Sequence, residues 1–385
     1  MGAGVVRSLP NGWTMTRLGD VLKFQPGFPF ESTYFSPPGV GIRLIKNRDL
    51  RSDDSIVSYA GPIPAGYEVH NGDVLVGMDG DFEPILWTKG TALLNQRVGR
   101  IVPSTSVDSR WIALALVNPL KDLEQETGAT TVKHLSHRDV EDLVIGMPAL
   151  SEQRAIAAAL SDAAAWVQSL DALIAKKRDM FAGTAQSLLE GHRRLPGFTS
   201  DWLVVPLSEI AEVTMGQSPP SSSYNRSGSG LPLIQGNADI VNRRTITRVW
   251  TSNPSKTAMH GEIIMTVRAP VGAIGVAQSH VCLGRGVCAI RAISVDDGFL
   301  RYQLQRMESD WESLSQGSTF TAANSTQVRG LTIAAPSSSD EQRAIAVILS
   351  DMDDEIEALV SQRDKAELIR QGMAQDLLSG KVRLV

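Results

Sequence analysis

The sequence predicts an α+β protein in which two similar mixed α/β domains alternate with two long helices. One observation is a pair of stretches of about 40 residues with a seven-residue apolar pattern, which is typical of a coiled coil. The other is an internal repeat: residues of the same type recur 189 positions apart along the chain. Together they predict two copies of one unit, related by a pseudo-twofold axis, with the long helices paired as an antiparallel coiled coil.

The first long helix is predicted over residues 152–189. Pro148 lies just before it and Gly191 just after it, where helix boundaries favour these residues. A helix of this length measures roughly 57 Å, too long for one domain to bury, so it requires a partner helix. The predicted seam residues are Ile156, Leu160, Val167, Leu170, Ile174, Phe181 and Leu188.

The second long helix, residues 340–380, is the predicted partner. Its seam positions each follow their counterparts by 189 residues, and they are Ile345, Leu349, Met352, Ile356, Leu359, Met373 and Leu377. Lys177, Arg363 and Arg370 also fall on the seam, where a charged residue costs stability but fixes register. Because each helix leaves the domain that precedes it, pairing makes the helices antiparallel.

The repeat extends through the globular parts, so the chain divides into residues 1–148, 149–191, 192–337 and 338–385. Short β-branched and apolar runs bounded by turn residues predict mostly strand in each domain. These strands are expected at residues 43–45, 73–77, 99–102 and 143–147, and again at 231–234, 262–267, 287–293 and 331–334. One helix is expected before the last strand, at residues 109–116 and 299–312.

Composition limits the classes of protein that fit. The chain has 385 residues and a net charge of −5, which argues against a broad basic surface that coats nucleic acid. A local DNA-reading face stays possible if a partner neutralises most phosphates. No run approaches the roughly 20 apolar residues of a membrane span. Cys282 and Cys288 lack metal-site spacing and indicate buried core residues in a protein of the reducing cytoplasm.

The order domain–helix–domain–helix carries a family resemblance. It is joined by a Glu-Gln-Arg start to each long helix, at residues 152–154 and 341–343, and by two segments of the second domain, GEIIMTVRAPVGAIG and GRGVCAIR. These features resemble the DNA specificity subunit of type I restriction–modification systems. The resemblance covers essentially the whole chain, with a looser match in the first domain.

The resemblance implies a non-catalytic subunit. Each globular domain would be a target-recognition domain that reads one half of a split, asymmetric sequence in double-stranded DNA. The helices would set the length of the unread gap and dock two adenine methyltransferase subunits, which work with restriction/translocase subunits. S-adenosylmethionine, ATP and Mg²⁺ are then expected on those partners and not on this chain, where no nucleotide-binding or methyltransferase motif is found.

Candidate base-reading residues follow the predicted strands, since Arg and Lys suit guanine and Asn and Gln suit adenine. In the first domain they are Lys46, Asn47, Arg48, Asp79, Lys89, Asn95, Gln96, Arg97, Lys133 and His134. In the second they are Gln235, Asn237, Arg268, Arg285, Ser318, Thr319 and Asn324. For any single residue, an ordinary solvated loop position is the alternative. Arg268 and Arg285 stand out because each follows or interrupts an apolar strand.

Two further readings remain open. The chain could be a structural adaptor whose two domains bind proteins instead of DNA, and the long helices could be a strut only. The outward helix faces, with Trp166 and Trp311, are candidate docking surfaces for methyltransferase subunits, although packing is the simpler explanation for Trp166. Binding to random duplexes in the presence of the methyltransferase subunit separates the DNA-reading subunit from the adaptor.

Overall fold

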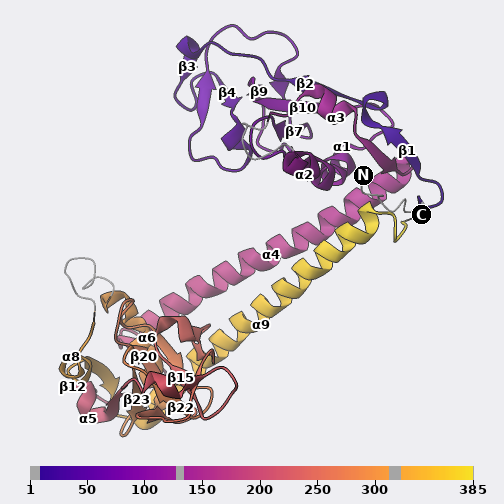
Figure 1. Ribbon diagram of the computed structural model, residues 1–385. Coiled ribbons are helices and arrows are strands. Elements are labelled where there is room, and N and C mark those ends of the chain that lie inside the picture. The colour runs from indigo at the N-terminus through magenta and orange to yellow at the C-terminus, as the bar shows by residue number, and fades with distance from the viewer. Residues whose placement is uncertain (1–8, 127–133, 312–321, 385) are drawn as a thin grey trace. The chain divides into compact units, whose positions relative to one another are not determined.

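The computed structural model describes residues 9–126, 134–311 and 322–384 (Figure 1). The chain divides into two compact units, Met1–Ser169 with Arg363–Val385, and Leu170–Gln362. Each unit therefore contains one globular domain and parts of both long helices. We refer to residues 14–147 as domain 1 and residues 202–336 as domain 2.

Domain 1 is built mainly of strands, as predicted. Its strands are β1 (Thr14–Arg17), β2 (Leu22–Pro26), β3 (Phe35–Ser36), β4 (Ile42–Ile45), β5 (Val57–Tyr59), β6 (Glu68–Val69), β7 (Val74–Gly77), β8 (Pro84–Leu86), β9 (Ala92–Leu94), β10 (Val98–Pro103) and β11 (Val144–Met147). Its helices are α1 (Ser109–Ala115), α2 (Val117–Glu126) and α3 (His137–Glu141).

Domain 2 repeats this order. Its strands are β12 (Trp202–Pro206), β13 (Ala211–Met215), β14 (Tyr224–Asn225), β15 (Leu231–Ile234), β16 (Ile240–Val241), β17 (Arg244–Thr245), β18 (Trp250–Thr251), β19 (Thr257–Ala258), β20 (Ile263–Thr266), β21 (Ile274–Val276), β22 (Val281–Leu283), β23 (Val287–Ala292) and β24 (Thr332–Pro336). Its helices are α5 (Leu207–Ile210), α6 (Asp297–Arg306) and α8 (Ser325–Arg329). The long helices are α4 (Leu150–Leu189) and α9 (Ser339–Leu378).

The strands form corresponding sheets in the two domains. Domain 1 has the strand orders β1-β11, β2-β10-β7-β8 and β3-β5-β4-β9-β6. Domain 2 has β12-β24, β13-β23-β20-β21-β17-β16 and β14-β18-β15-β22-β19. The central pair β4 and β9 is parallel, and so is its counterpart β15 and β22. The predicted repeat is thus a repeat of topology, with one hairpin added in domain 2.

Strand β7 joins two cores, which explains why its sequence is apolar throughout. Val74 and Val76 pack against Trp111 of α1, while Leu75, on the opposite face, packs with Trp87 and a second set of buried residues. Alternate side chains of a strand point to opposite faces, so a strand covered on both sides needs no polar position. In domain 2, β20 divides its side chains between two cores in the same way.

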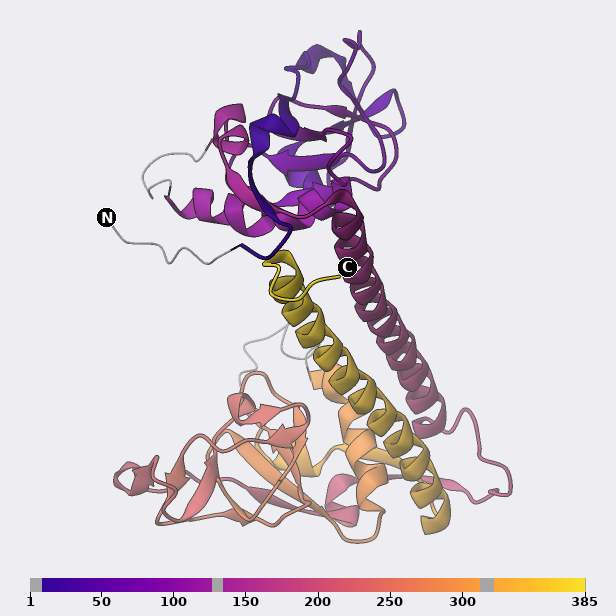
Figure 2. The ribbon, with the colours of Figure 1, turned by 90° about the vertical axis from the view of Figure 1, so that its right-hand side faces the viewer.

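The long helices pair end to start within each unit. Ile156 and Leu160 near the start of α4 share a core with Leu377 near the end of α9. Leu188 near the end of α4 shares another core with Ile345 and Leu349 near the start of α9. Figure 2 shows the last turns of α9 beside the first turns of α4. The helices are therefore antiparallel. Five of the predicted seam positions are half-buried, namely Val167, Met352, Ile356, Leu359 and Met373.

A buried glutamate at the start of each long helix binds an arginine that follows the end of the other. Glu152 is 2% exposed and pairs with Arg383, whose Nη2 lies 2.6 Å from its Oε2. Glu341 is 0% exposed, and Arg194 contacts both of its oxygens at 2.7 Å. Because a buried carboxylate is costly without a counter-ion, each pair fixes the chain segment that follows the end of a long helix.

The glutamine of the same Glu-Gln-Arg start joins the helix to its domain. Gln153 donates to the carbonyl oxygen of Pro148 at 2.9 Å and accepts from the amide of Asp108, the residue that caps α1, at 2.9 Å. Gln342 makes the same bonds to Pro336 and Asp296, at 2.7 and 2.8 Å. The arginine is different, since Arg343 is exposed and bonds only to the exposed Asp340.

Some expectations about elements need correction. We expected one helix between the last two strands, but the described residues of domain 1 contain three, since α2 and α3 follow α1. The helix predicted at residues 299–312 is α6, which begins and ends earlier, and Glu312 lies outside the described residues. Trp311 is buried, with 6% exposed, so the expectation that it belongs to an outward docking face is wrong. Trp166 is 43% exposed.

The variant Arg383→Gln should have a melting temperature lower by about 5 °C or more, because it leaves the carboxylate of Glu152 buried without its counter-ion. The hydrogen bond from Arg383 holds the pKa of Glu152 below its ordinary value of 4.5. A depressed pKa contributes stability above about pH 4.5 that is lost as the pH falls through the folded-state pKa. The difference between variant and wild type is therefore full at pH 7 and shrinks in acid.

Thermal unfolding measured between pH 7 and pH 3.5 checks this expectation. Arg343→Gln is the matched control, because it removes an exposed arginine from the corresponding helix start and should leave the melting temperature unchanged. Equal losses in both variants would contradict the buried-pair explanation.

Candidate nucleic-acid interface

Four loop segments meet at one edge of each domain. Loop cluster 1 comprises residues 46–49, 78–79, 95–97 and 134, which follow β4 and β7, join β9 to β10, and precede α3. Loop cluster 2 comprises residues 235–239, 267–268, 284–286 and 322, at the corresponding places of domain 2. All but two of the candidate base-reading residues in the described part of the chain belong to these clusters. The exceptions are Lys89, which lies beside loop cluster 1, and Asn324, which caps α8 in domain 2.

The candidates Lys133, Ser318 and Thr319 lie outside the described residues.

The two clusters are held by the same backbone hydrogen bonds. The amide of Met78 donates to the carbonyl of Arg97 at 3.0 Å, and that of Val267 donates to Gly286 at 2.8 Å. The amides of Leu135 and Ala323 then donate to the carbonyls of Met78 and Val267, each at 2.8 Å. The isolated bridges Asp79–His134 and Arg268–Ala322 are equivalent as well. The backbone frame is therefore common to both domains, whatever side chains it carries.

A glycine permits the turn between β9 and β10 in domain 1 and the turn between β22 and β23 in domain 2. A Cβ atom on Gly27 would lie 2.0 Å from the carbonyl oxygen of Asn95, and one on Gly216 would lie 2.1 Å from that of Gly284. Such distances exclude any side chain, so only glycine permits this close approach of two backbone segments. The turn that carries residues 95–97 or 284–286 is thereby packed against the residue that follows β2 or β13.

A buried aspartate orders the first loop of each cluster. Asp49 is 1% exposed and accepts the amide of Lys46 at 2.8 Å. Asp239 is 3% exposed and accepts the amide of Gln235 at 2.7 Å, and it also pairs with Arg248 at 2.8 Å. Each aspartate closes a short 3₁₀ turn, Asn47–Leu50 or Asn237–Asp239, and so holds the polar residues after β4 and β15 in place.

Asp79 links three segments of loop cluster 1. Its carboxylate pairs with Arg97 and accepts Nδ1 of His134 at 2.9 Å, and its backbone oxygen accepts Nδ2 of Asn47 at 2.6 Å. Burial alone would raise the pKa of Asp79, but the hydrogen bonds from His134 and Arg97 outweigh it and lower the pKa below its ordinary value. Asp79 is therefore anionic at neutral pH, while Arg97 is 64% exposed.

Loop cluster 2 carries a cation where loop cluster 1 carries this anion, and a second cation in the turn between β22 and β23. Arg268 is exposed and occupies the place of Asp79 in the frame. Arg285 is also exposed, and its Nε donates to Oγ of Ser218 at 3.1 Å. Guanidinium groups present several donors in a rigid fork, which suits the paired acceptors of guanine or a phosphate. The two clusters thus offer opposite charge at equivalent places.

The other candidates have more varied surroundings. The ammonium of Lys46 lies 5.1 Å from the ring centre of Phe35, and Arg48 is exposed and donates to Ser55. Gln96, Gln235 and Asn237 are exposed loop residues, and Asn95 is half-buried. Lys89 pairs with Asp53 at 2.9 Å, beside the first loop. Asn324 caps α8 by accepting the amide of Gln327 at 3.0 Å, so its side-chain oxygen already has a structural partner.

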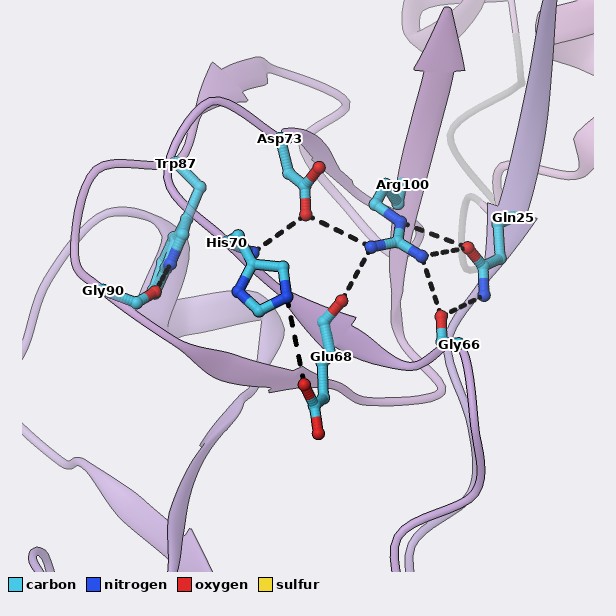
Figure 3. A network of polar contacts seen from close by, with 8 residues as sticks. All are labelled: Gln25, Gly66, Glu68, His70, Asp73, Trp87, Gly90 and Arg100. Atoms are coloured by element: carbon cyan, nitrogen blue, oxygen red, sulfur yellow. Dashed lines mark hydrogen bonds and ion pairs between the residues drawn. The ribbon is translucent and has the colours of Figure 1, made fainter.

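Arg100 shows that a cation on these strands is not by itself a reading residue. It lies on β10 and donates to Gln25, to the carbonyls of Gly66 and Glu68, and to Asp73 (Figure 3). Only 15% of its side chain is exposed. Its donors are used inside domain 1, where they tie the segment before β6 to β2 and β10.

Sequence reasoning missed two residues that contact loop cluster 2 from outside it. Ser218 is not among the candidates, yet its Oγ accepts a hydrogen bond from Nε of Arg285. Arg248 was not considered, although it is the partner of the buried Asp239. Both contacts join segments at least nine residues apart, and no local pattern signals them.

The described residues place no metal site near either cluster. No group of three or more His, Cys, Asp or Glu side chains with metal-binding geometry occurs among them. Cys282 and Cys288 are both buried, as expected. Within the same residues, no helix combines the length and apolar composition needed to cross a bilayer.

Comparison with known proteins agrees with this architecture. Residues 10–175 and 199–367 match the family model described as the type I restriction modification DNA specificity domain. The putative type I restriction enzyme MjaX specificity subunit of Methanocaldococcus jannaschii is 32% identical over 289 residues, 71% of this chain and 64% of that protein. The EcoBI specificity subunit of Escherichia coli is 37% identical over 166 residues, 43% of this chain and 35% of that protein.

The chain therefore spans less than two thirds of the length of these two curated relatives in the aligned regions. Among solved structures, a chain from a study of complex assembly and conformational transition in a type I R-M system is 25% identical, with a TM-score of 0.60 over 98% of this chain and 100% of that one. The S subunit from M. genitalium shares the fold, at 16% identity and a TM-score of 0.66 over 97% of each chain. With the family model matched in both of its repeats, this chain belongs to the family of type I restriction–modification DNA specificity subunits.

Proposed function

We propose that this chain reads a split, asymmetric DNA sequence, one half through loop cluster 1 and the other through loop cluster 2. The observation that carries the proposal is that the two clusters share a backbone frame but differ in their polar side chains. A shared frame places side chains against equivalent positions of a duplex, and different side chains then select different bases.

The proposal includes the partners that the family resemblance implies. The chain is non-catalytic and works in the cytoplasm with two adenine methyltransferase (modification) subunits and with restriction/translocase subunits. Those subunits hold S-adenosylmethionine, ATP and Mg²⁺ and carry out the reactions. The long helices serve as their docking frame and set the unread gap between the half-sites.

The domain assignment is tested by exchanging one domain. Residues 3–147 are replaced by the corresponding domain of another specificity subunit, and the chimera is expressed with its methyltransferase. Because loop cluster 2 is untouched, one half of the methylated sequence should change and the other half should stay the same. Sequencing of methylated adenines in the host DNA gives the result, with the unmodified chain as control. A change in both halves together would contradict independent reading by the two domains.

DNA affinity should depend on the methyltransferase subunits. The isolated chain has a net charge of −5 and should bind duplexes weakly, because phosphate neutralisation supplies much of the affinity of DNA-binding proteins. The chain with two methyltransferase subunits should bind its site tightly and select it over random duplexes. Filter binding at physiological salt measures both. Nanomolar specific binding by the isolated chain would contradict this expectation, and a complex indifferent to sequence would favour a protein-binding adaptor.

A further inference from the structure

The position shared by Asp79 and Arg268 is where the two loop clusters differ most in charge. Asp79 follows Met78 and Arg268 follows Val267, and these two preceding residues make the equivalent backbone bonds of the frame. Asp79 and Arg268 also form the equivalent bridges to the segments before α3 and α8. The backbone therefore puts the two side chains at the same place in their domains. One is a carboxylate with two cationic or donor partners, and the other is an exposed guanidinium.

The contacts of Asp79 leave it poorly suited to read a base itself. Its side chain is 17% exposed, and its carboxylate is engaged by Arg97 and by Nδ1 of His134. Arg97, by contrast, is 64% exposed and has five N–H donors, of which the contact with Asp79 occupies only part. The residue available to DNA in this pair is therefore the arginine, and the aspartate restrains it.

Restraint matters because a long, flexible side chain loses conformational freedom when it binds. Arg97 held by Asp79 has already lost part of that freedom in the free protein, so its fork is presented in a limited set of orientations. Guanine offers the O6 and N7 acceptors that such a fork binds in two places at once. An unrestrained arginine binds phosphates and several bases instead, with less discrimination.

We propose that Asp79 is a positioning residue that orients Arg97 toward a guanine of the half-site read by domain 1, whereas Arg268, at the same place in domain 2, contacts DNA directly. This inference rests on the proposed function. It adds which side chain reads, which one orients it, and which base is selected. Because Ser218 holds Arg285, a restrained arginine in the turn before β10 or β23 is common to both domains.

The test uses the chain assembled with its methyltransferase subunits and duplexes that carry the mapped target. At each position of the domain 1 half-site, all four base pairs are compared. In Asp79→Asn the preference for one G·C pair should fall roughly tenfold, the range expected for a weakened bidentate contact. Arg97→Lys should lose that preference while keeping its charge. The double variant should show the same preference for the G·C pair as Arg97→Lys alone, because both changes act on the same contact between Arg97 and guanine.

Matched controls separate positioning from a general structural effect. Asp142→Asn removes a carboxylate from an exposed ion pair with Arg17 in the same unit, and it should leave base preference unchanged. Arg268→Gln should alter binding through the other half-site only. Melting temperatures are measured for every variant, and Arg97→Lys changes an exposed side chain, so its reading can be assessed even if Asp79→Asn is unstable.

Three results would overturn the inference. Equal weakening of all duplexes by Asp79→Asn, with base preference intact, would mean that Asp79 only braces the loops. A domain 1 half-site without a G·C pair would exclude guanine as the base that is read. Unchanged preference in Arg97→Lys would remove Arg97 as the reader. In each case specific binding by the wild-type complex shows that the proposed function still stands, whereas a wild-type complex without any sequence preference overturns both.

Discussion

The pairing of a buried glutamate with an arginine from the far end of the other long helix is the constraint on which each unit depends. Glu152 and Glu341 stand where a long helix enters a domain, and neither is accessible to water. Their counter-ions, Arg383 and Arg194, come from the segments after α9 and α4. Since an unpaired buried carboxylate is strongly unfavourable, helix starts and helix ends must be assembled together, which selects the antiparallel pairing.

The neighbouring glutamines carry this constraint into the domains. Gln153 and Gln342 each bond to a proline just before the long helix and to the residue that caps α1 or α6. The orientation of each long helix is therefore tied to its own domain by amide hydrogen bonds in a buried place. In this repeated Glu-Gln motif, the glutamate therefore connects the two long helices and the glutamine connects a long helix to its domain.

The loop clusters show how a fixed frame tolerates divergence. Frame bonds run between backbone groups, and the glycines at positions 27 and 216 are required by backbone contact, so the same frame forms whether Asp79 or Arg268 occupies the shared position. Asp79 and Arg268 can therefore differ in charge without changing the backbone. Under the proposed function, this separation of support from reading lets two domains of one fold select different DNA sequences.

The repeat and the heptad pattern allowed the domain order and the long helices to be predicted, and short apolar runs predicted four strands of each domain. Those strands are β4, β7, β10 and β11 in domain 1 and β15, β20, β23 and β24 in domain 2. Those features depend on local periodicity and on an offset of 189 residues that is visible in the printed chain. The arginines that pair with the buried glutamates, Arg194 and Arg383, are also 189 residues apart, although their role was not predicted. The small helices α2 and α3 were missed because short helices carry little periodicity of their own.

The sequence by itself determined that the chain is a duplicated unit with polar loops after apolar strands, because burial of apolar side chains imposes periods that can be read directly. Only the tertiary structure decided which of those polar residues are free to meet a ligand. Arg97, Arg100 and Arg285 all stand in or next to polar loops of the sequence. In the structure, Arg97 is exposed and pairs with Asp79, whereas Arg100 uses its donors inside domain 1 and Arg285 donates to Ser218. Those differences arise from contacts between segments far apart in the chain, which no local pattern records.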